Sequence, residues 1–264
     1  MADGVSGFAA GDTAALSTAG FCCVLFCSDC SYPVHYHFGG VRGIGELSVE
    51  RTAGETMIHI YRPPIIVRKL FPGIVWENQW GGILLTFDDG PVPGITERIL
   101  ERLAKHNIRA LFFVVGEQAK KYPELCSEIL RAGHEIGNHT EHHKRMTRLG
   151  KQEAIQEIQS VQDFFLKEFS LPLRWFRPPH GRFNLSTVQT VEALSLRMMM
   201  WTLLTYDFEN SAETVMRSYD KYLRKDSIVV LHNSVKSEQI ILQSIDALAE
   251  RALAAGLSIG RPAA

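Results

Sequence analysis

Residues 82–91 read Gly-Ile-Leu-Leu-Thr-Phe-Asp-Asp-Gly-Pro, and this stretch determines how the rest of the chain is interpreted. The apolar run predicts a buried strand, which the Gly-Pro pair ends abruptly. Successive side chains on a strand point to opposite faces, so Asp88 and Asp89 are presented in different directions. One carboxylate can bind a metal ion while its neighbour accepts a proton. Because adjacent carboxylates repel one another, we expect positive charge close to them.

The rest of the regular sequence alternates strand and helix patterns. Apolar residues at helical spacing predict helices, and short apolar runs that end at Gly or Pro predict strands. The predicted strands cover residues 83–87, 110–115, 135–137, 175–176, 198–204 and 228–231, and the predicted helices cover 95–106, 123–132, 151–169, 186–194, 212–223 and 237–255. Repeated strand-then-helix units predict a parallel sheet with active residues at the carboxyl ends of its strands. The methionines at 198–200 lie in an apolar run, which favours core packing over a soft-metal site.

Length and composition limit the possible classes of protein. The 264 residues suit one domain of the α/β-barrel size class, or two smaller ones. The formal net charge of -1 gives no reason to expect a nucleic-acid or anionic-membrane partner. No apolar run approaches the roughly 20 residues of a transmembrane helix. The apolar patch at 21–26 has no Lys or Arg before it, so it lacks the basic start of a secretory signal, and a cytoplasmic protein is expected.

The first 56 residues differ in composition from the remainder. They are rich in Gly, Ala, Ser and Cys and show neither strand nor helix periodicity. Four of the five cysteines lie between Cys22 and Cys30, but with no second pair at metal-site spacing they are interpreted as thiols of a tail. The sequence predicts a poorly ordered extension or a mis-assigned start at residues 1–56, and one regular domain at residues 57–264.

Histidines follow the third predicted strand. In Gly137-Asn138-His139-Thr140-Glu141-His142-His143, the residues His139 and His143 are four apart, so one turn of helix would bring both imidazoles to one face. Two histidines with one carboxylate form a three-ligand set that leaves open positions on a divalent ion, and Asp89 is the natural third ligand. His142 is the alternative partner of His139, at a spacing of three.

Further candidate residues follow the later strands. Arg177, in Phe176-Arg177-Pro178-Pro179-His180-Gly181, is a cation aimed by a rigid turn and can supply the positive charge that the paired carboxylates require. The tight turn also offers backbone N–H groups to a developing oxyanion. His232 ends the last predicted strand, where it is either a general acid or a satisfied core histidine. Asp207 is a candidate charge partner for it.

In this order, the motifs resemble the five motifs of the NodB-homology polysaccharide deacetylases, which form carbohydrate esterase family 4. The resemblance extends over residues 80–260, and the corresponding segments are Thr86–Pro91, His139–His143, Arg177–Gly181, Asp207-Phe208 and Leu231-His232. It implies an α/β fold, specifically a distorted (β/α) barrel with about seven parallel strands.

By position in these motifs, the resemblance makes Asp89, His139 and His143 the ligands of a divalent metal ion. This favours His143 over His142 as the second histidine. Zinc fits such a ligand set best, although Co, Ni or Mn can also occupy a site of two histidines and one aspartate.

The resemblance also implies an activity: a metal-dependent hydrolase that removes N-acetyl groups from N-acetylglucosamine-containing oligo- or polysaccharides, such as peptidoglycan or chitin, and releases acetate. Asp88 would be the catalytic base, oriented by Arg177. His232 would be the catalytic acid, with Asp207 beside it. Two alternatives remain open: a deacylase or amidase for a small non-polymeric or lipid-linked amide, and a non-catalytic, metal-retaining carbohydrate-binding protein.

Substrate contacts follow from the same resemblance. The backbone N–H of His180 would help to bind the oxyanion, and Leu231 and Phe208 would line the pocket for the acetyl methyl group. The chain departs from the family pattern at His180, where an aromatic residue, often Tyr, is usual. Leu204 replaces the first Asp of the fourth motif, Phe208 replaces its Trp, and Asn233 stands where Asp is frequent. These departures concern the choice of substrate more than the chemistry.

Overall fold

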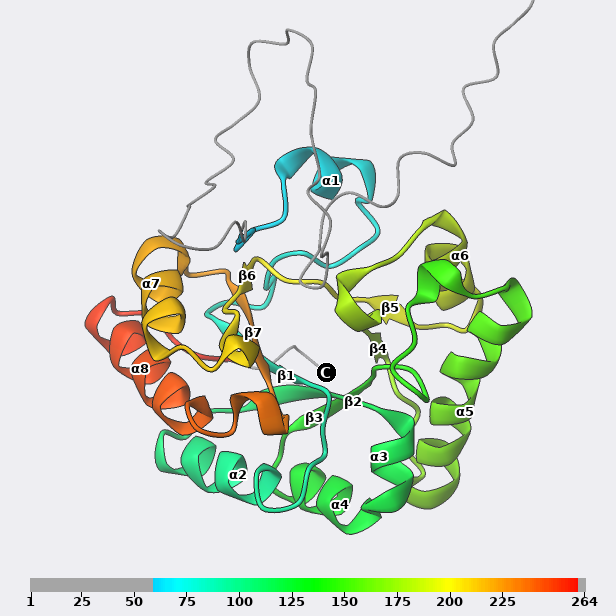
Figure 1. Cartoon of the computed structure of the whole chain (residues 1–264), viewed down its shortest axis with the longest axis horizontal. Coiled ribbons are helices and arrows are strands. Elements are labelled where there is room, and N and C mark those ends of the chain that lie inside the picture. Colours follow the sequence, from blue (N-terminus) through cyan, green and yellow to red (C-terminus); the bar gives the residue numbers. More distant parts are fainter. Residues whose placement is uncertain (1–58, 261–264) are drawn as a thin grey trace, which may run out of the picture.

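The computed structural model describes residues 59–260, which form a parallel seven-stranded sheet curled into a half-barrel with helices around its outside (Figure 1). The strands are arranged in the order β5-β4-β3-β2-β1-β7-β6. They are β1 (Leu84–Asp88), β2 (Ala110–Val114), β3 (Glu135–Asn138), β4 (Trp175–Phe176), β5 (Arg197–Met198), β6 (Leu203–Leu204) and β7 (Ile228–His232). The predicted distorted barrel of parallel strands is therefore confirmed.

Helices follow most of the strands and pack on the outer side of the sheet. They are α2 (Thr96–Lys105), α3 (Gly116–Lys121), α4 (Pro123–Arg131), α5 (Lys151–Phe169), α6 (Leu185–Ala193), α7 (Ala212–Tyr222) and α8 (Ile241–Ala254). The short helix α1 (Ile65–Leu70) precedes β1 and lies at the opening of the half-barrel (Figure 1). Short 3-10 turns lie at η2 (Met146–Arg148), η3 (Pro179–Gly181), η4 (Asp207–Glu209) and η5 (Val235–Ser237). The sequence pattern missed α1 and α3 because each has 6 residues, too few for a helical period to be recognised.

The register of β1 fixes which side chains meet inside the barrel. β1 pairs with β2 and β7, and all five of its residues are buried. Asp88 lies beside His232, and Phe87 lies beside Leu231. Neighbours across parallel strands point to the same face, so Asp88 shares one face with His232, and Phe87 shares the other with Leu231. Phe87 stacks on Phe112 of β2 with ring centroids 4.9 Å apart, within the apolar layer on that second face.

The prediction of one strand at residues 198–204 is wrong in its extent. β5 ends at Met198 and β6 begins at Leu203, on opposite edges of the sheet. The carbonyl oxygens of Met199 and Met200 accept hydrogen bonds from the side chain of Arg177, so they are not available to a neighbouring strand. All three methionines of this run are buried, as core packing predicts.

The segment that contains α1 connects the two edges of the half-barrel (Figure 1). At the β5 edge, Val75 donates its N–H to the carbonyl of Met198 and accepts the N–H of Met200, both at 2.9 Å. At the β6 edge, the N–H of Leu204 donates to the carbonyl of Tyr61, also at 2.9 Å. The segment therefore supplies hydrogen-bond partners to both outer strands.

Some expectations fall on residues that the structure does not describe. The predictions for residues 1–56, including the thiol-rich tail, lie outside the described residues, and so does the predicted domain start at Met57. Within residues 59–260, the helices are all too short or too polar to cross a lipid bilayer.

The two adjacent residues Phe165 and Leu166 provide a test of the packing of α5. Phe165 is fully buried, whereas Leu166 is 57% exposed although it belongs to the same apolar pattern. We expect Phe165→Ala to lower the free energy of unfolding by about 3–5 kcal/mol, because it leaves a cavity in the core. Leu166→Ala should change it by no more than about 0.5 kcal/mol. Urea denaturation of both variants measures the difference, and equal losses would contradict the packing described.

Candidate active site and metal centre

Arg177 is the central side chain of the candidate site. It follows β4, and its side chain is fully buried. Its Nη1 donates hydrogen bonds to Asp88 Oδ1 and to the hydroxyl of Thr86, each at 2.7 Å. Its Nε and Nη2 donate to the carbonyls of Met199 and Met200 at 3.2 and 2.9 Å. These bonds hold the Asp88 carboxylate in one orientation and place beside it the positive charge that the sequence requires.

The guanidinium stays charged despite its burial. Burial lowers the pKa of Arg177, and the carboxylate of Asp88 opposes that shift. Arginine nevertheless remains protonated at all physiological pH values. The guanidinium carbon lies 4.1 Å from the ring centroid of Phe113, close enough for a cation–π contact. The burial of a charge is expensive unless its donors are used, and here all three nitrogens have acceptors.

The three predicted metal ligands come together beside Asp88. One candidate ligand atom each from Asp89, His139 and His143 lies within 4.8 Å of the others. Asp89 Oδ1 is 3.1 Å from Nε2 of His143 and 3.6 Å from Nε2 of His139. Burial alone would raise the pKa of Asp89, but the interactions with the adjacent imidazoles of His139 and His143 outweigh it and hold the pKa well below its usual range. The carboxylate is thus in the ionised form that binds a cation.

The tautomer of His139 fits a metal ligand. Its Nδ1 lies 2.8 Å from the carbonyl oxygen of Arg177, an acceptor that requires Nδ1 to carry the proton. The lone pair of Nε2 is then directed towards Asp89. This arrangement, in which the outer nitrogen of a histidine donates to a carbonyl, is the usual support of a metal-bound imidazole. The donor set of two imidazoles and one carboxylate therefore fits a divalent metal ion.

The two histidines lie in a loop rather than on one turn of helix, so the predicted helical spacing is wrong. His143 has φ 55°, and Thr140 has φ 68°, both in the left-handed region that non-glycine residues seldom adopt. The strained backbone turns His143 towards Asp89. His142 points elsewhere, because its Nδ1 lies 2.9 Å from Glu157 Oε1 and its side chain is 52% exposed. The structure thus favours His143 over His142.

Glu157 is a residue that the sequence analysis missed. It belongs to α5 and is 4% exposed, and its second oxygen accepts the backbone N–H of His142 at 2.9 Å. Burial would raise the pKa of Glu157, but the hydrogen bonds from His142 and Lys144 lower it. The helical period could have revealed this residue, since Glu157 falls between Ala154 and Val161 on the buried stripe of the helix. Glu157 anchors the loop that carries His143.

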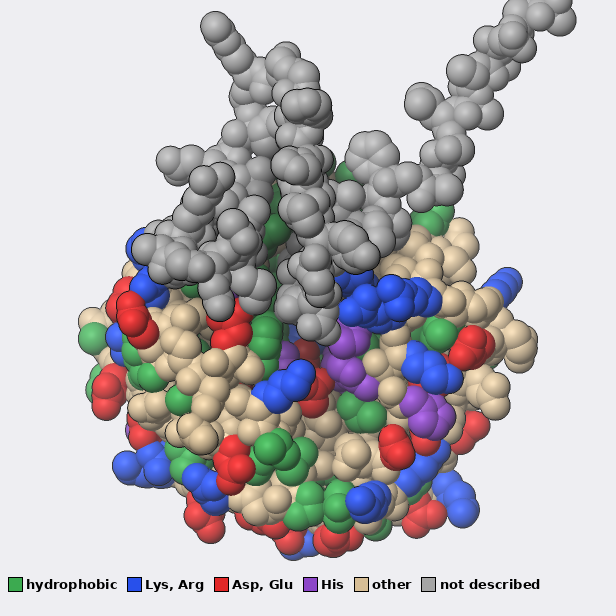
Figure 2. All heavy atoms as spheres, viewed as in Figure 1, with side chains coloured by type: hydrophobic (Ala, Val, Ile, Leu, Met, Phe, Trp, Pro, Cys, Tyr) green, Lys and Arg blue, Asp and Glu red, His purple; other side chains and the backbone are tan. Residues whose placement is uncertain are grey.

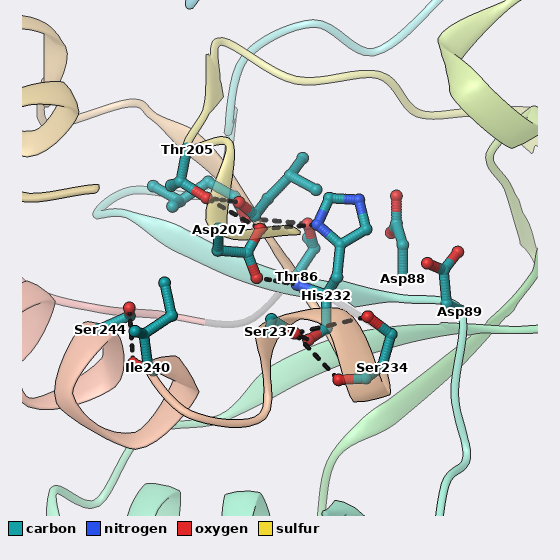
Figure 3. A network of polar contacts seen from close by, with 12 residues as sticks. Thr86, Asp88, Asp89, Thr205, Asp207, His232, Ser234, Ser237, Ile240 and Ser244 are labelled. Carbon is teal, nitrogen blue, oxygen red and sulfur yellow. Dashed lines mark hydrogen bonds and ion pairs between the residues drawn. The ribbon is translucent and has the colours of Figure 1, made fainter. Parts of the chain in front are cut away.

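His232 lies on the other side of Asp88, at the end of β7, and Figure 3 shows its ring beside the carboxylates of Asp88 and Asp89. Its Nδ1 is 2.7 Å from Asp207 Oδ1, and its backbone N–H donates to Asp207 Oδ2 at 2.7 Å. Asp207 is fully buried in η4, and the hydroxyl of Thr205 donates to it at 3.2 Å. Burial alone would lower the pKa of His232, but Asp207, Asp89 and Asp88 raise it to about 9. The ring is therefore protonated at neutral pH.

His180 and Phe208 both reach the candidate site. The ring of His180 packs edge-on against His143 with centroids 4.6 Å apart, and its backbone is left-handed with φ 59°. Burial and the charges of His143 and Arg145 lower the pKa of His180 to about 4, so it is neutral. The ring of Phe208 lies edge-on to His232 at 5.1 Å. In the space-filling view, histidine side chains gather near the centre of this face of the molecule, with acidic side chains beside them (Figure 2).

The structure does not place the side chain of Leu231 beside His232 and Phe208 in the candidate site. Leu231 precedes His232 on β7, is fully buried, and shares with Phe87 the face turned away from Asp88. Strand alternation places Val230, two residues before His232, on the face of the catalytic groups. The alternation of side chains along residues 228–232 could have identified Val230, rather than Leu231, as the residue that faces the site.

The anchoring role of Glu157 can be tested through metal affinity. Glu157→Gln weakens the attachment of His142, so we expect the Kd for zinc to rise about 10-fold, the lower end for residues that support metal ligands. Glu153→Gln is the matched control, because Glu153 also pairs with Lys144 but its side chain is 49% exposed, whereas that of Glu157 is 4% exposed. Competition with a chromogenic chelator measures both values. An unchanged Kd in folded Glu157→Gln would contradict the role.

The chain is similar in sequence to known proteins. The family model described as polysaccharide deacetylase matches residues 78–199. A peptidoglycan-N-acetylglucosamine deacetylase of Bacillus cereus is 31% identical over 182 residues, which cover 67% of this chain and 84% of that protein. A chitooligosaccharide deacetylase of Azorhizobium caulinodans is 30% identical over 173 residues, covering 65% of this chain and 82% of that protein. Other curated relatives are matched over only 22% to 60% of their length.

Solved structures share the fold. The peptidoglycan N-acetylglucosamine deacetylase Bc1960 superposes with a TM-score of 0.67 at 24% identity, over 72% of this chain and 90% of that one. A CE4 family pseudoenzyme from Bacillus anthracis superposes with a TM-score of 0.63 at 24% identity, over 70% and 66% of the two chains. The two curated relatives that are 31% and 30% identical, and that are matched over 84% and 82% of their length, show that this chain belongs to the polysaccharide deacetylase family, carbohydrate esterase family 4.

Proposed function

We propose that the protein is a metal-dependent N-deacetylase that hydrolyses the acetamido group of N-acetylglucosamine-containing oligo- or polysaccharides and releases acetate. The observation that carries this proposal is the placement of a candidate base, Asp88, and a candidate acid, His232, side by side across β1 and β7 and next to the Asp89–His139–His143 cluster. A divalent ion held by this cluster, which we propose to be zinc, would supply Lewis-acid activation of water and of the amide carbonyl.

Asp88 is suited to accept the proton of the attacking water. One of its oxygens accepts a hydrogen bond from Arg177 at 2.7 Å, which fixes the orientation of the carboxylate. The hydroxyl of Thr86 donates onward to the carbonyl of Val229 at 2.8 Å and supports the guanidinium from β1. A carboxylate positioned in this way acts as a general base without having to reorganise.

His232 is suited to protonate the departing amine. An amine is a poor leaving group unless it receives a proton, and His232 carries one at neutral pH. Asp207 accepts from Nδ1, so the other ring nitrogen, Nε2, is the one that can deliver a proton to the substrate. Asp88 and His232 therefore have opposite roles, one accepting and one donating.

The acyl group and the oxyanion have candidate partners too. Phe208, beside His232, and Val230, on the same face of β7, are proposed to line the pocket for the acetyl methyl group. The backbone N–H of His180, in the turn that follows Arg177, is proposed to donate to the oxyanion. The two curated relatives are named for peptidoglycan and chitooligosaccharide, and both names support an N-acetylated amino sugar as the substrate here.

Acetate release from defined substrates tests the proposal. The zinc-loaded protein should release acetate from chitooligosaccharides or from peptidoglycan, and the metal-free protein should not. Small cyclic amides and lipid-linked sugars in the same panel would identify the alternative amidase activity. Zinc binding without acetate release from any substrate would overturn the proposal and leave a metal-retaining binding protein.

Asp88→Asn tests the catalytic base. The variant keeps all three metal ligands, so its zinc affinity should be that of the wild type. Without an ionisable base, kcat should fall by about 10²–10⁴-fold, the usual contribution of a general acid–base group. Steady-state kinetics together with a zinc titration separate the two effects, and turnover near that of the wild type would refute the assignment.

The pH dependence tests the acid. The protonated form of His232 is present below its pKa of about 9, so kcat/KM should fall as the pH rises through that value. Asp207→Asn removes the negative charge that most raises this pKa, and the alkaline limb of the profile should therefore shift to lower pH. A profile from about pH 6 to about pH 10 measures the shift. An alkaline limb that stays in place would exclude His232 as the acid tuned by Asp207.

A further inference from the structure

We infer that residues 59–61, which precede the region matched by the family model, belong to the active site and position the turn that carries Asp207 and Phe208 against His232. We call residues 59–61 the N-terminal strap. The inference that they influence catalysis rests on the proposed function. The inference that they position η4 does not.

Three polar contacts join the strap to residues 204–209, which include the end of β6 and the turn η4. His59 Nε2 lies 2.9 and 3.0 Å from the two carboxylate oxygens of Glu209, the last residue of η4. The N–H of Ile60 donates to the hydroxyl oxygen of Tyr206 at 2.8 Å. The carbonyl of Tyr61 accepts the N–H of Leu204 at 2.9 Å. These contacts join segments that are almost 150 residues apart in the sequence.

The strap is also packed against the site through aromatic rings. The ring of His59 lies edge-on to Tyr206 at 4.4 Å, Tyr206 lies 5.5 Å from Phe208, and Phe208 lies 5.1 Å from His232. Both His59 and Tyr206 are less than a tenth exposed, and Tyr61 stacks on Tyr222 of α7 at 5.1 Å. A continuous series of ring contacts therefore runs from the strap to the candidate acid.

The backbone of the turn explains why such support is needed. Tyr206 has φ 59° and Asn210 has φ 55°, so non-glycine residues in the left-handed region stand on both sides of η4. This conformation costs free energy and persists only where the surrounding contacts determine it. His59 holds the carboxylate at one end of the turn and packs on the ring at the other. The strap supplies these contacts from outside the turn.

The consequence for the reaction follows from what η4 carries. Asp207 makes two hydrogen bonds to His232, and Phe208 covers its ring. A displaced turn would move the group that orients the acid and also the proposed wall of the acyl pocket. We therefore assign His59 and Glu209 as positioning residues that influence the discrimination between acyl groups of different size.

Two variants and one control of the full chain test this assignment. His59→Phe keeps a ring against Tyr206 but removes the pairing with Glu209, and Glu209→Gln removes the charge from the other partner. Glu213→Gln is the control. It removes an ion pair of similar length, 2.6 Å to Arg217, on the neighbouring helix α7, where the side chain of Glu213 is 82% exposed.

Amide hydrogen exchange gives a readout that does not depend on activity. The N–H of His232 donates to Asp207, so its protection reports the position of η4. In both variants, exchange in peptides spanning 204–210 and 230–233 should accelerate about 10-fold relative to the wild type, while the peptide spanning 139–145 and the control variant stay unchanged. Unchanged exchange would overturn the inference. Acceleration throughout the chain would also overturn it, because the strap would then act only on global stability.

The acyl selectivity of the zinc-loaded enzyme gives the second readout. The ratio of kcat/KM for an N-acetyl sugar over its N-propionyl analogue should fall about 10-fold in both variants, a typical discrimination for one methylene group. An unchanged ratio in active variants would overturn the assignment to the acyl pocket. If the wild type hydrolyses neither substrate, the proposed function fails, and hydrogen exchange still decides whether the strap positions η4.

Discussion

The buried ion pair between Arg177 and Asp88 is the interaction on which the rest of the structure depends. A guanidinium without exposure to water must find an acceptor for each nitrogen, and it finds them on two different parts of the fold. One is the end of β1, and another is the run between β5 and β6. The same requirement therefore interrupts the edge strand and fixes the candidate base. The irregular half of the barrel and the site have a common cause.

Arg177 also connects the two functional halves of the site. Its side chain holds Asp88, and its backbone carbonyl holds the outer nitrogen of His139. The candidate base and one metal ligand are thus attached to a single residue, so their separation varies little. Because the guanidinium donates in a fixed planar arrangement, lysine could not reproduce these contacts. The prolines at 178 and 179 follow directly and limit the freedom of the same backbone.

The sequence predicted Asp89 and His139 as ligands because each directly follows a strand, and strand ends converge in a parallel sheet. The choice of His143 as the third ligand came from the family resemblance. The sequence did not predict the loop around His143, whose left-handed backbone depends on a carboxylate from α5. The family resemblance placed Leu231 in the pocket, although the period of two assigns it to the other face. No local pattern could reveal His59, since its partner Glu209 lies 150 residues away. The predicted strand at 198–204 failed because its carbonyls are used by a distant arginine.

The open shape of the barrel has a further consequence, for solubility. A half-barrel leaves two outer strands whose backbone N–H and C=O groups could pair with another chain, and such edges are a common origin of aggregation. Here β5 and β6 contain only 2 residues each, and Val75 and Tyr61 occupy neighbouring backbone groups. The segment around α1 thus covers both edges of the sheet against pairing with another chain. A truncation that removes this segment would expose the unpaired backbone groups of both edge strands as well as one side of the site.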